Sequence, residues 1–252
     1  MMGVLNIIND GATRILELNR PDKRNALNDE LIAALKAALR EADADESLRA
    51  VVIRGAGKDF CSGADLSALQ KVASASFEEN VEDARSLAEL FELPRKLRVP
   101  VMAAVRGRAL AGGFGLALAC DLIVADNTSR FGFPEVKIGF VPALVAAMVQ
   151  RNMSEKDAFA TLTLGYEMSG VELSGIGLVH GIFNDETFDE DVINFTKQYE
   201  KLSGSAVAMT KRLLYDIDGL TFPDAITLGV EKNAQARMTD DCKKGIAKFL
   251  NK

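Results

Sequence analysis

The residues whose types and spacing point most clearly to chemistry lie in a glycine-rich stretch, Arg106–Asp121, that continues into an apolar run. The pattern predicts a glycine-rich turn that runs directly into an apolar helix. A helix N-terminus carries free backbone N–H groups and the positive end of the helix dipole. Because glycine lets a ligand approach the backbone closely, such a corner can hold an anion, including one that exists only in a transition state.

A second corner of the same kind occurs at Phe60–Leu66, where small residues again separate an apolar strand from the start of a helix. Two such corners that face each other could direct two backbone N–H groups at one oxygen, which defines an oxyanion hole. The alternative interpretation is that both are only tight turns. A phosphate-binding loop is disfavoured because no Lys-Ser or Lys-Thr pair follows the glycines, and their spacing also lacks the dinucleotide-binding pattern.

The elements that must position these corners alternate between strands and helices. Asp10–Gly11 lies between two apolar runs and predicts a hairpin, and Asn28 is a suitable N-cap for an amphipathic helix that ends near residue 43. This alternation predicts an α/β fold with a helical C-terminal region. The remaining expected elements are strands at 50–53, 100–105 and 122–125, a mobile loop at 71–80, a helix at 77–93, and only helices after about residue 189.

Composition narrows the class of protein. With 252 residues, 48% apolar and 26% charged, the chain suits one large globular domain. Its net charge of −6 argues against nucleic acid and anionic membranes as partners, and no apolar run is long enough to span a bilayer. Three scattered cysteines and the lack of a signal peptide predict a cytoplasmic protein. No Cys/His cluster has metal-ligand spacing, and the single histidine, His180, is predicted to be structural.

The chain contains five characteristic segments: Asn19–Leu27, Phe60–Leu66, Ala104–Asp121, Phe131–Gly139 and Thr239–Leu250. In this order and together they resemble the crotonase, or enoyl-CoA hydratase/isomerase, superfamily. The resemblance implies a crotonase-like spiral of ββα units with an acyl-CoA site over residues 1–190, and a C-terminal helical trimerisation region over residues 191–252. It also implies a homotrimer or a dimer of trimers, an acyl-CoA thioester as substrate, and no separate cofactor, since coenzyme A is part of the substrate.

The same resemblance implies a particular site. In such enzymes the thioester oxygen lies between two backbone N–H groups, which the motif positions assign to Ala64 and Gly112. Glu135 stands where these enzymes have a catalytic glutamate after a Pro-Glu turn. Two-base hydratases carry a further glutamate in the glycine-rich helix, and this chain has Gly115 at that position.

The missing carboxylate leaves several reactions open. A 1,3-proton shift needs one base, so Glu135 as the single acid/base favours double-bond isomerisation of enoyl-CoA. Hydration with Glu135 alone, the water being held also by the Ala143 N–H, is the alternative, and the fold supports other enolate reactions of CoA thioesters. A non-catalytic member that binds acyl-CoA or RNA is the remaining possibility. Leu144 and Val145 replace glycines that the family often has there, and they should narrow or repack the pocket.

The resemblance also implies contacts with coenzyme A. Basic side chains near residue 23 would meet the nucleotide, lysines at the C-terminus would reach a phosphate across a subunit boundary, and backbone groups around Ala64 would hold the adenine. The residues assigned in this way to substrate or coenzyme A binding are Lys23, Arg24, Ala26, Ala64, Asp65, Leu66, Gly112, Ala143, Lys248 and Lys252.

Overall fold

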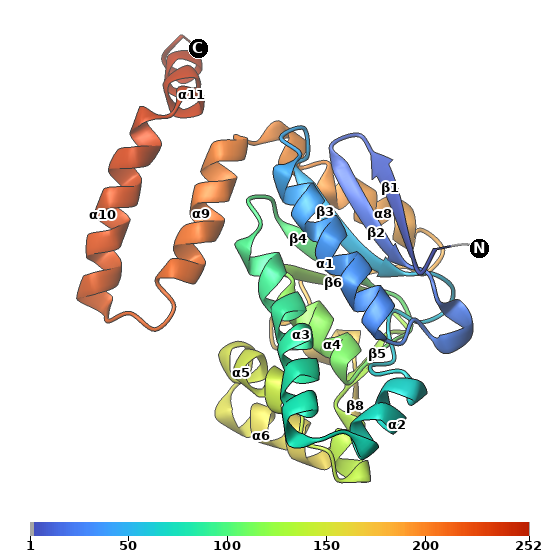
Figure 1. Ribbon diagram of the computed structural model, residues 1–252. Coiled ribbons are helices and arrows are strands. Elements are labelled where there is room, and N and C mark those ends of the chain that lie inside the picture. Colours follow the sequence, from blue (N-terminus) through green and yellow to red (C-terminus); the bar gives the residue numbers. More distant parts are fainter. Residues whose placement is uncertain (1–2, 252) are drawn as a thin grey trace.

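The computed structural model describes residues 3–251, apart from the side chains of Leu66 and Leu69, and contains a large and a small β-sheet (Figure 1). The large sheet has the strand order β1-β2-β3-β4-β6-β9. Its first two strands form the antiparallel hairpin that the Asp10–Gly11 turn predicts, and all other neighbours are parallel. The strands are β1 (Leu5–Asp10), β2 (Thr13–Leu18), β3 (Ala50–Gly55), β4 (Val101–Val105), β6 (Leu122–Asp126) and β9 (Gly181–Phe183).

The small sheet has the order β5-β7-β8, formed by Arg108–Leu110, Arg130–Gly132 and Glu167–Ser169. Two of its strands, β5 and β7, each follow a strand of the large sheet directly along the chain. Strand β4 is followed by β5 and then helix α4, and strand β6 is followed by β7 and then helix α5. Each repeat therefore contributes one strand to each sheet before its helix, which is the expected spiral of ββα units.

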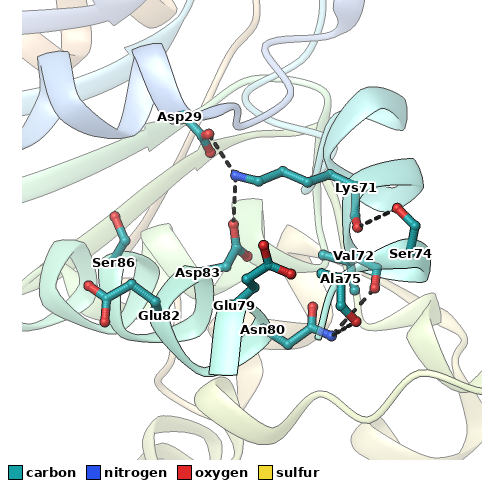
Figure 2. Close-up of a pocket in the computed structure, with 10 residues that line it drawn as sticks. All are labelled: Asp29, Lys71, Val72, Ser74, Ala75, Glu79, Asn80, Glu82, Asp83 and Ser86. Carbon is teal, nitrogen blue, oxygen red and sulfur yellow. Dashed lines mark hydrogen bonds and ion pairs between the residues drawn. The ribbon is translucent and has the colours of Figure 1, made fainter. Parts of the chain in front are cut away.

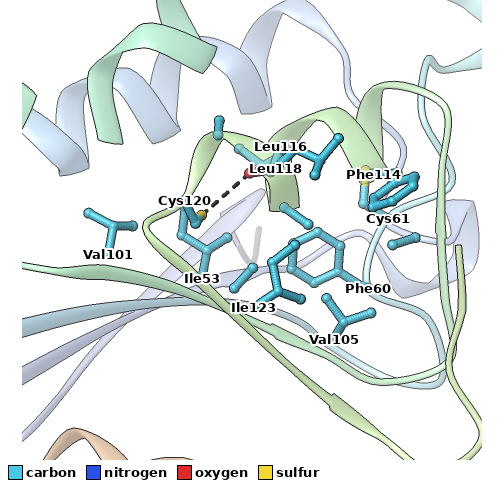
Figure 3. Packing of buried hydrophobic residues seen from close by; sticks show 14 of the residues in the cluster. Ile53, Phe60, Cys61, Val101, Val105, Phe114, Leu116, Leu118, Cys120 and Ile123 are labelled. Carbon is cyan, nitrogen blue, oxygen red and sulfur yellow. Dashed lines mark hydrogen bonds between the residues drawn. The ribbon is translucent and has the colours of Figure 1, made fainter. Parts of the chain in front are cut away.

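Helix α4 (Gly112–Ala119) lies at the centre of the hydrophobic core, and Gly113 to Ala119 are all buried. Figure 3 shows Leu116 and Leu118 of this helix above residues of β3, β4 and β6. The Phe114 ring stacks on Phe133 with a centroid distance of 4.8 Å and lies 5.1 Å from the Phe131 ring. This packing fixes the segment that follows β7 against the glycine-rich helix.

Two further helices cover the core beside α4. Helix α1 (Asp29–Ala44) begins as expected, with the Asn28 side chain accepting a hydrogen bond from the Leu31 N–H at 3.0 Å. Helix α3 (Phe77–Lys96) packs against both α1 and α4. It begins at Phe77 as predicted but ends three residues beyond the predicted Leu93.

The prediction of a mobile loop over 71–80 is wrong for most of its length, because residues 71–74 and 77–80 are helical. Helix α2 (Leu66–Ser74) continues through residues 71–74, and only a short turn separates it from α3. The Asp65 carboxylate caps α2 by accepting from the Ser67 N–H at 2.9 Å. The small, polar composition of this stretch hid a helix that depends on its N-cap rather than on a continuous apolar stripe.

Helices at the C-terminal end divide between the sheet and an extended arm. Helix α8 (Phe188–Thr196) buries Phe188 and Val192 against the second face of the large sheet, so the boundary predicted at residue 190 falls inside this helix. The arm consists of α9 (Gly204–Asp216), α10 (Phe222–Met238) and α11 (Asp240–Leu250), and it projects from the body (Figure 1).

Helix α9 attaches the arm. The buried Lys211 ammonium donates to Asp121 at 2.6 Å and to the carbonyls of Pro94 and Val99. Helices α10 and α11 have no buried residue in this chain. Within residues 3–251, no helix is both long enough and apolar enough to cross a membrane. The remaining helical elements are η1 (Pro21–Lys23), η2 (Pro134–Ile138), α5 (Ala143–Asn152), α6 (Glu155–Leu164), α7 (Gly170–Gly175) and η3 (Tyr199–Lys201).

Candidate active site

The two glycine-containing corners lie against each other, as the oxyanion-hole interpretation requires. The Cys61 N–H donates to Arg108 O at 3.0 Å, and the Leu110 N–H donates to Cys61 O at 2.9 Å. A side chain at Gly113 would place its Cβ 2.2 Å from Cys61 O, and one at Gly63, where φ is +91°, would lie 2.7 Å from Ala111 Cβ. Glycine is therefore needed on both sides of the contact for the two backbones to approach this closely.

Ala64 and Gly112 line one cavity of about 470 Å³. Gly112 is the first residue of α4, where a helix leaves its N–H groups without intrahelical acceptors. The parallel bridge between Leu27 and Ala64 fixes the other corner through the Leu27 and Asp65 N–H groups, and not through the Ala64 N–H. Among residues 3–251, neither the Ala64 nor the Gly112 N–H donates to a protein acceptor.

Glu135 lies on the wall of the same cavity. The Ala111 N–H donates to Gly132 O at 2.9 Å, which ties the strand before Glu135 to the start of α4. One carboxylate oxygen, Glu135 Oε2, is buried and has no hydrogen-bond partner in the part of the chain that the structure describes. Burial raises the pKa of the Glu135 carboxyl, since desolvation disfavours its charged form. The cavity therefore holds a carboxylate that is more basic than an exposed glutamate.

Gly115 faces apolar side chains. A Cβ at this position would lie 2.6 Å from Val145 Cγ1 and 2.9 Å from Phe91 Cζ. The place of the second carboxylate of two-base hydratases is therefore filled by a valine and a phenylalanine, both buried. Val145 also lines the active-site cavity, and its effect on the choice of acyl chain stays a prediction.

Replacing Gly115 with alanine should destabilise the protein by about 1–3 kcal/mol, because the added methyl overpacks the core. An exchange of glycine for alanine inside a helix ordinarily stabilises by about 0.5–1 kcal/mol, so the contact with Val145 reverses the sign. Urea denaturation of Gly115→Ala measures the change. The double variant Gly115→Ala/Val145→Ala should recover part of the loss relative to Val145→Ala alone. A Gly115→Ala variant more stable than the wild type would contradict this account of the packing.

Ala143 lies on the cavity wall at the start of α5, but its N–H does not have the expected role. It donates to Val141 O at 2.7 Å. Pro142 has φ −75° and ψ 56°, the geometry of an inverse γ-turn, which closes this bond over three residues. The prediction that the Ala143 N–H holds a water is therefore wrong for this conformation.

The residues assigned to coenzyme A near the N-terminus gather at the edge of the Ala64 corner. Arg24 has φ +50°, and its carbonyl accepts from the Ser62 N–H at 3.0 Å. Lys23 is exposed beside it, and Ala26 is buried. The first residue of α2, Leu66, follows the corner directly. The structure thus brings Lys23, Arg24, Ala26, Ala64, Asp65 and Leu66 together, and their contacts with coenzyme A stay a prediction.

Arg20 is a positioning residue that the sequence reasoning missed. Its guanidinium donates to Ala26 O and lies 2.6 Å from Asp65 Oδ2. Hydrogen bonds from the Ser67 N–H and from Arg20 lower the pKa of Asp65 to about 2. The Asp65 side chain is therefore occupied in joining two segments. The position of Arg20 directly before Pro21 in the first motif segment is the signal that could have drawn attention to it.

Lys248 is not brought to this edge within one chain. Lys248 is an exposed residue of α11, at the far end of the arm from α2 (Figure 1). Lys252 lies outside the described residues. His180 is placed as expected for a structural residue: its N–H donates to Ile123 O at 2.7 Å, and its ring packs edge-on against Phe195.

The fold and the site define an α/β protein of the crotonase class, with a cavity at the junction of two glycine corners. The chain matches the enoyl-CoA hydratase/isomerase family model over residues 9–252, and it belongs to that family. It is 39% identical to a putative enoyl-CoA hydratase of Thermus thermophilus over 97% of each chain. It is 30% identical to a probable enoyl-CoA hydratase of Rhizobium meliloti over 96% of this chain and 93% of the relative.

Solved structures agree with these relatives. The crystal structure of an enoyl-CoA hydratase from Mycobacterium smegmatis superposes with a TM-score of 0.95 at 30% identity, covering 99% of this chain and 97% of the other. An enoyl-CoA hydratase from Polaromonas superposes with a TM-score of 0.94 at 29% identity, covering 99% and 97%. The spiral fold and the membership of an enzyme family are therefore established for this chain.

Proposed function

We propose that this enzyme acts on enoyl-CoA thioesters with Glu135 as its single acid/base and the N–H groups of Ala64 and Gly112 as donors to the thioester oxygen. One observation carries the proposal: a buried, unpartnered carboxylate oxygen and two unengaged N–H groups line the same cavity. A well-aimed backbone donor stabilises a developing oxyanion by about 3–4 kcal/mol. Two donors with one nearby base suit a reaction that passes through a thioester enolate.

The reaction we favour is isomerisation of a 3-enoyl-CoA to a 2-enoyl-CoA. Glu135 removes a proton from C2, and the C–H electron pair forms the enolate, whose negative oxygen accepts from the two N–H groups. Return of the proton from Glu135 to C4 shifts the double bond from C3–C4 to C2–C3. The reaction consumes no water and regenerates the carboxylate. The apolar side chains beside Gly115 support it, because Phe91 and Val145 occupy the space that a carboxylate side chain at position 115 would need.

Hydration of a 2-enoyl-CoA is the second candidate, and the names of the relatives favour it. Each general acid or base contributes roughly 10²–10⁴-fold, so a hydratase that relies on Glu135 alone would be slower but active. Incubation with trans-2- and trans-3-enoyl-CoA in ¹⁸O-labelled water, followed by mass spectrometry, separates the two. Isomerisation leaves the mass unchanged, and hydration adds one labelled oxygen. Binding of acyl-CoA with no turnover of either compound would instead indicate a non-catalytic member.

The raised pKa of Glu135 predicts the acid side of the pH profile. The reaction needs the carboxylate form, which is present only above the pKa of the folded site. The acid limb of kcat/KM should therefore lie above pH 4.5, the ordinary value for a glutamate. Initial rates with saturating and limiting substrate across the acid range measure it. An acid limb at or below that value would show that a different group, or a solvated Glu135, controls the rate.

We further propose a homotrimer or a dimer of trimers, assembled through the arm. Its exposed apolar residues support this, since large apolar side chains on a helix face mark an interaction surface. Sedimentation velocity should give three or six chain masses, and a monomer at micromolar concentration would contradict the proposal. Lys248 and Lys252 would then act on a neighbouring subunit's nucleotide. Residence in the cytoplasm also stays a proposal. The exposed apolar residues of α10 and α11 are Phe222, Ile226, Val230, Met238, Ile246, Phe249 and Leu250.

A further inference from the structure

A second cavity, of about 550 Å³, lies between α2 and α3 next to the active-site cavity (Figure 2). Asp29, Val72 and Asp83 line both cavities, so they form the boundary between them. A larger share of the second cavity's lining residues is charged, with Lys71, Glu79 and Glu82 also on its wall beside Val72 and Ala75. Passage from the first cavity to the second therefore leads from an apolar to a charged environment.

Helix α3 shows how this change is arranged. Asp83, Leu87 and Phe91 follow one another at intervals of four residues, and all three line the active-site cavity. At 1.5 Å per residue, Asp83 lies about 12 Å along the helix from Phe91. Phe91 contacts the space beside Gly115, whereas Asp83 lies at the boundary with the second cavity. The cavity is thus apolar near the glycine-rich helix and charged at its other end.

One lysine of the second cavity pairs with two carboxylates at this charged end. Lys71 is the only charged residue of α2. Its ammonium lies 3.0 Å from Asp29 Oδ2 on α1 and 3.9 Å from Asp83 Oδ1 on α3, so it joins three helices across the boundary (Figure 2). Figure 2 also shows hydrogen bonds from Ser74 Oγ to Lys71 O at 3.2 Å and from Asn80 Nδ2 to Val72 O and Ala75 O at 3.4 Å each.

We propose that the Asp29–Lys71–Asp83 bridge ends the acyl-binding part of the cavity and makes the enzyme selective for short acyl chains. The inference rests on the proposed function. A short chain gains contact with Leu87 and Phe91 and stops before the bridge. A longer chain must displace the bridge and enter the second cavity, where its methylene groups gain less apolar contact than beside Leu87 and Phe91 and where the charges lose hydration. Each methylene that stays in apolar surroundings is worth roughly fourfold in affinity.

The test compares kcat/KM for short-, medium- and long-chain enoyl-CoA in the wild type, Lys71→Met and Asp83→Ala. Wild-type kcat/KM should fall beyond short chains, and both variants should raise the long-to-short ratio by roughly tenfold, equivalent to just under two methylene groups. Lys96→Met is the matched control, since Lys96 forms an exposed pair with Glu92 on α3 and lines neither cavity. Its ratio should equal that of the wild type.

Two further readouts separate a selectivity role from a structural one. Exposed ion pairs add little to stability, so the denaturation midpoint of Lys71→Met should match the wild type. Salt screens such pairs, so added salt should raise the wild-type ratio and leave the Lys71→Met ratio unchanged. If the wild type, Lys71→Met and Asp83→Ala had the same dependence of kcat/KM on chain length, the proposal would be overturned. If the wild type turned over no enoyl-CoA, the proposed function would fail, and calorimetric affinities for saturated acyl-CoA of the same lengths would test the bridge independently.

Discussion

Glu135→Gln should lower kcat by roughly 10²–10⁴-fold, the contribution of a general acid/base. Glutamine has nearly the same shape but cannot accept the C2 proton. The substrate should still bind, because its coenzyme A portion and thioester oxygen contact other groups, so KM should change little. Steady-state kinetics with the active enoyl-CoA isomer measure both constants. The variant should fold at least as stably as the wild type, since it removes an ionisable group one of whose oxygens is buried with no hydrogen-bond partner among the described residues.

Glu190→Gln on α8 is the matched control. Glu190 is exposed and makes no side-chain hydrogen bond within the described residues, so its substitution should leave kcat unchanged. Exchange of the substrate C2 proton with deuterated solvent adds a second readout, and it should be lost in Glu135→Gln but not in the control. An unimpaired Glu135→Gln variant would exclude this carboxylate as the base.

Gly112→Pro should lower kcat by roughly 10²–10³-fold, the cost of removing one oxyanion donor. A side-chain substitution cannot delete a backbone N–H, but proline replaces that hydrogen with its ring. Gly112 is the first residue of α4, which is the helical position that accepts proline best. The loss should appear mainly in kcat, because the oxygen carries more charge in the enolate than in the bound thioester.

Gly112→Ala is the control for this substitution. It keeps the N–H, and its Cβ would lie 3.4 Å from Leu27 Cδ1, an ordinary contact. This variant should keep kcat within roughly tenfold of the wild type, well above the proline variant. Circular dichroism and the oligomeric mass establish that both variants fold. Equal kcat values for folded Gly112→Pro and Gly112→Ala would show that the Gly112 N–H does not stabilise the enolate.

Local signals in the sequence predicted much of this fold. The Asp10–Gly11 turn, the Asn28 cap and the strand–glycine–helix order each depend on residues close together in the chain, and the structure confirms them. The pairing of the two corners is a long-range contact, and it was predicted because both corners follow strands with the same order of elements. Glu135 was placed by its motif, which the resemblance supplied.

Other features depend on packing that no local pattern records. The Asp65 carboxylate that caps α2 also accepts from Arg20, which comes from a distant segment. The filling beside Gly115 comes from Phe91 and Val145 on two other helices. The turn at Pro142 engages the Ala143 N–H through backbone dihedral angles that residue types do not determine. Each of these outcomes was decided by tertiary geometry.

The buried Lys211–Asp121 pair joins the arm to the far end of α4. Asp121 follows the last turn of this helix, whereas Gly112 begins it, and eight residues of helix span only about 12 Å. Helix α4 is buried along nearly its whole length and therefore behaves as a stiff rod. One end of the rod lies at the reactive cavity and the other bears the attachment of the arm. Helix α4 therefore determines both the position of the arm and the direction in which the Gly112 N–H points.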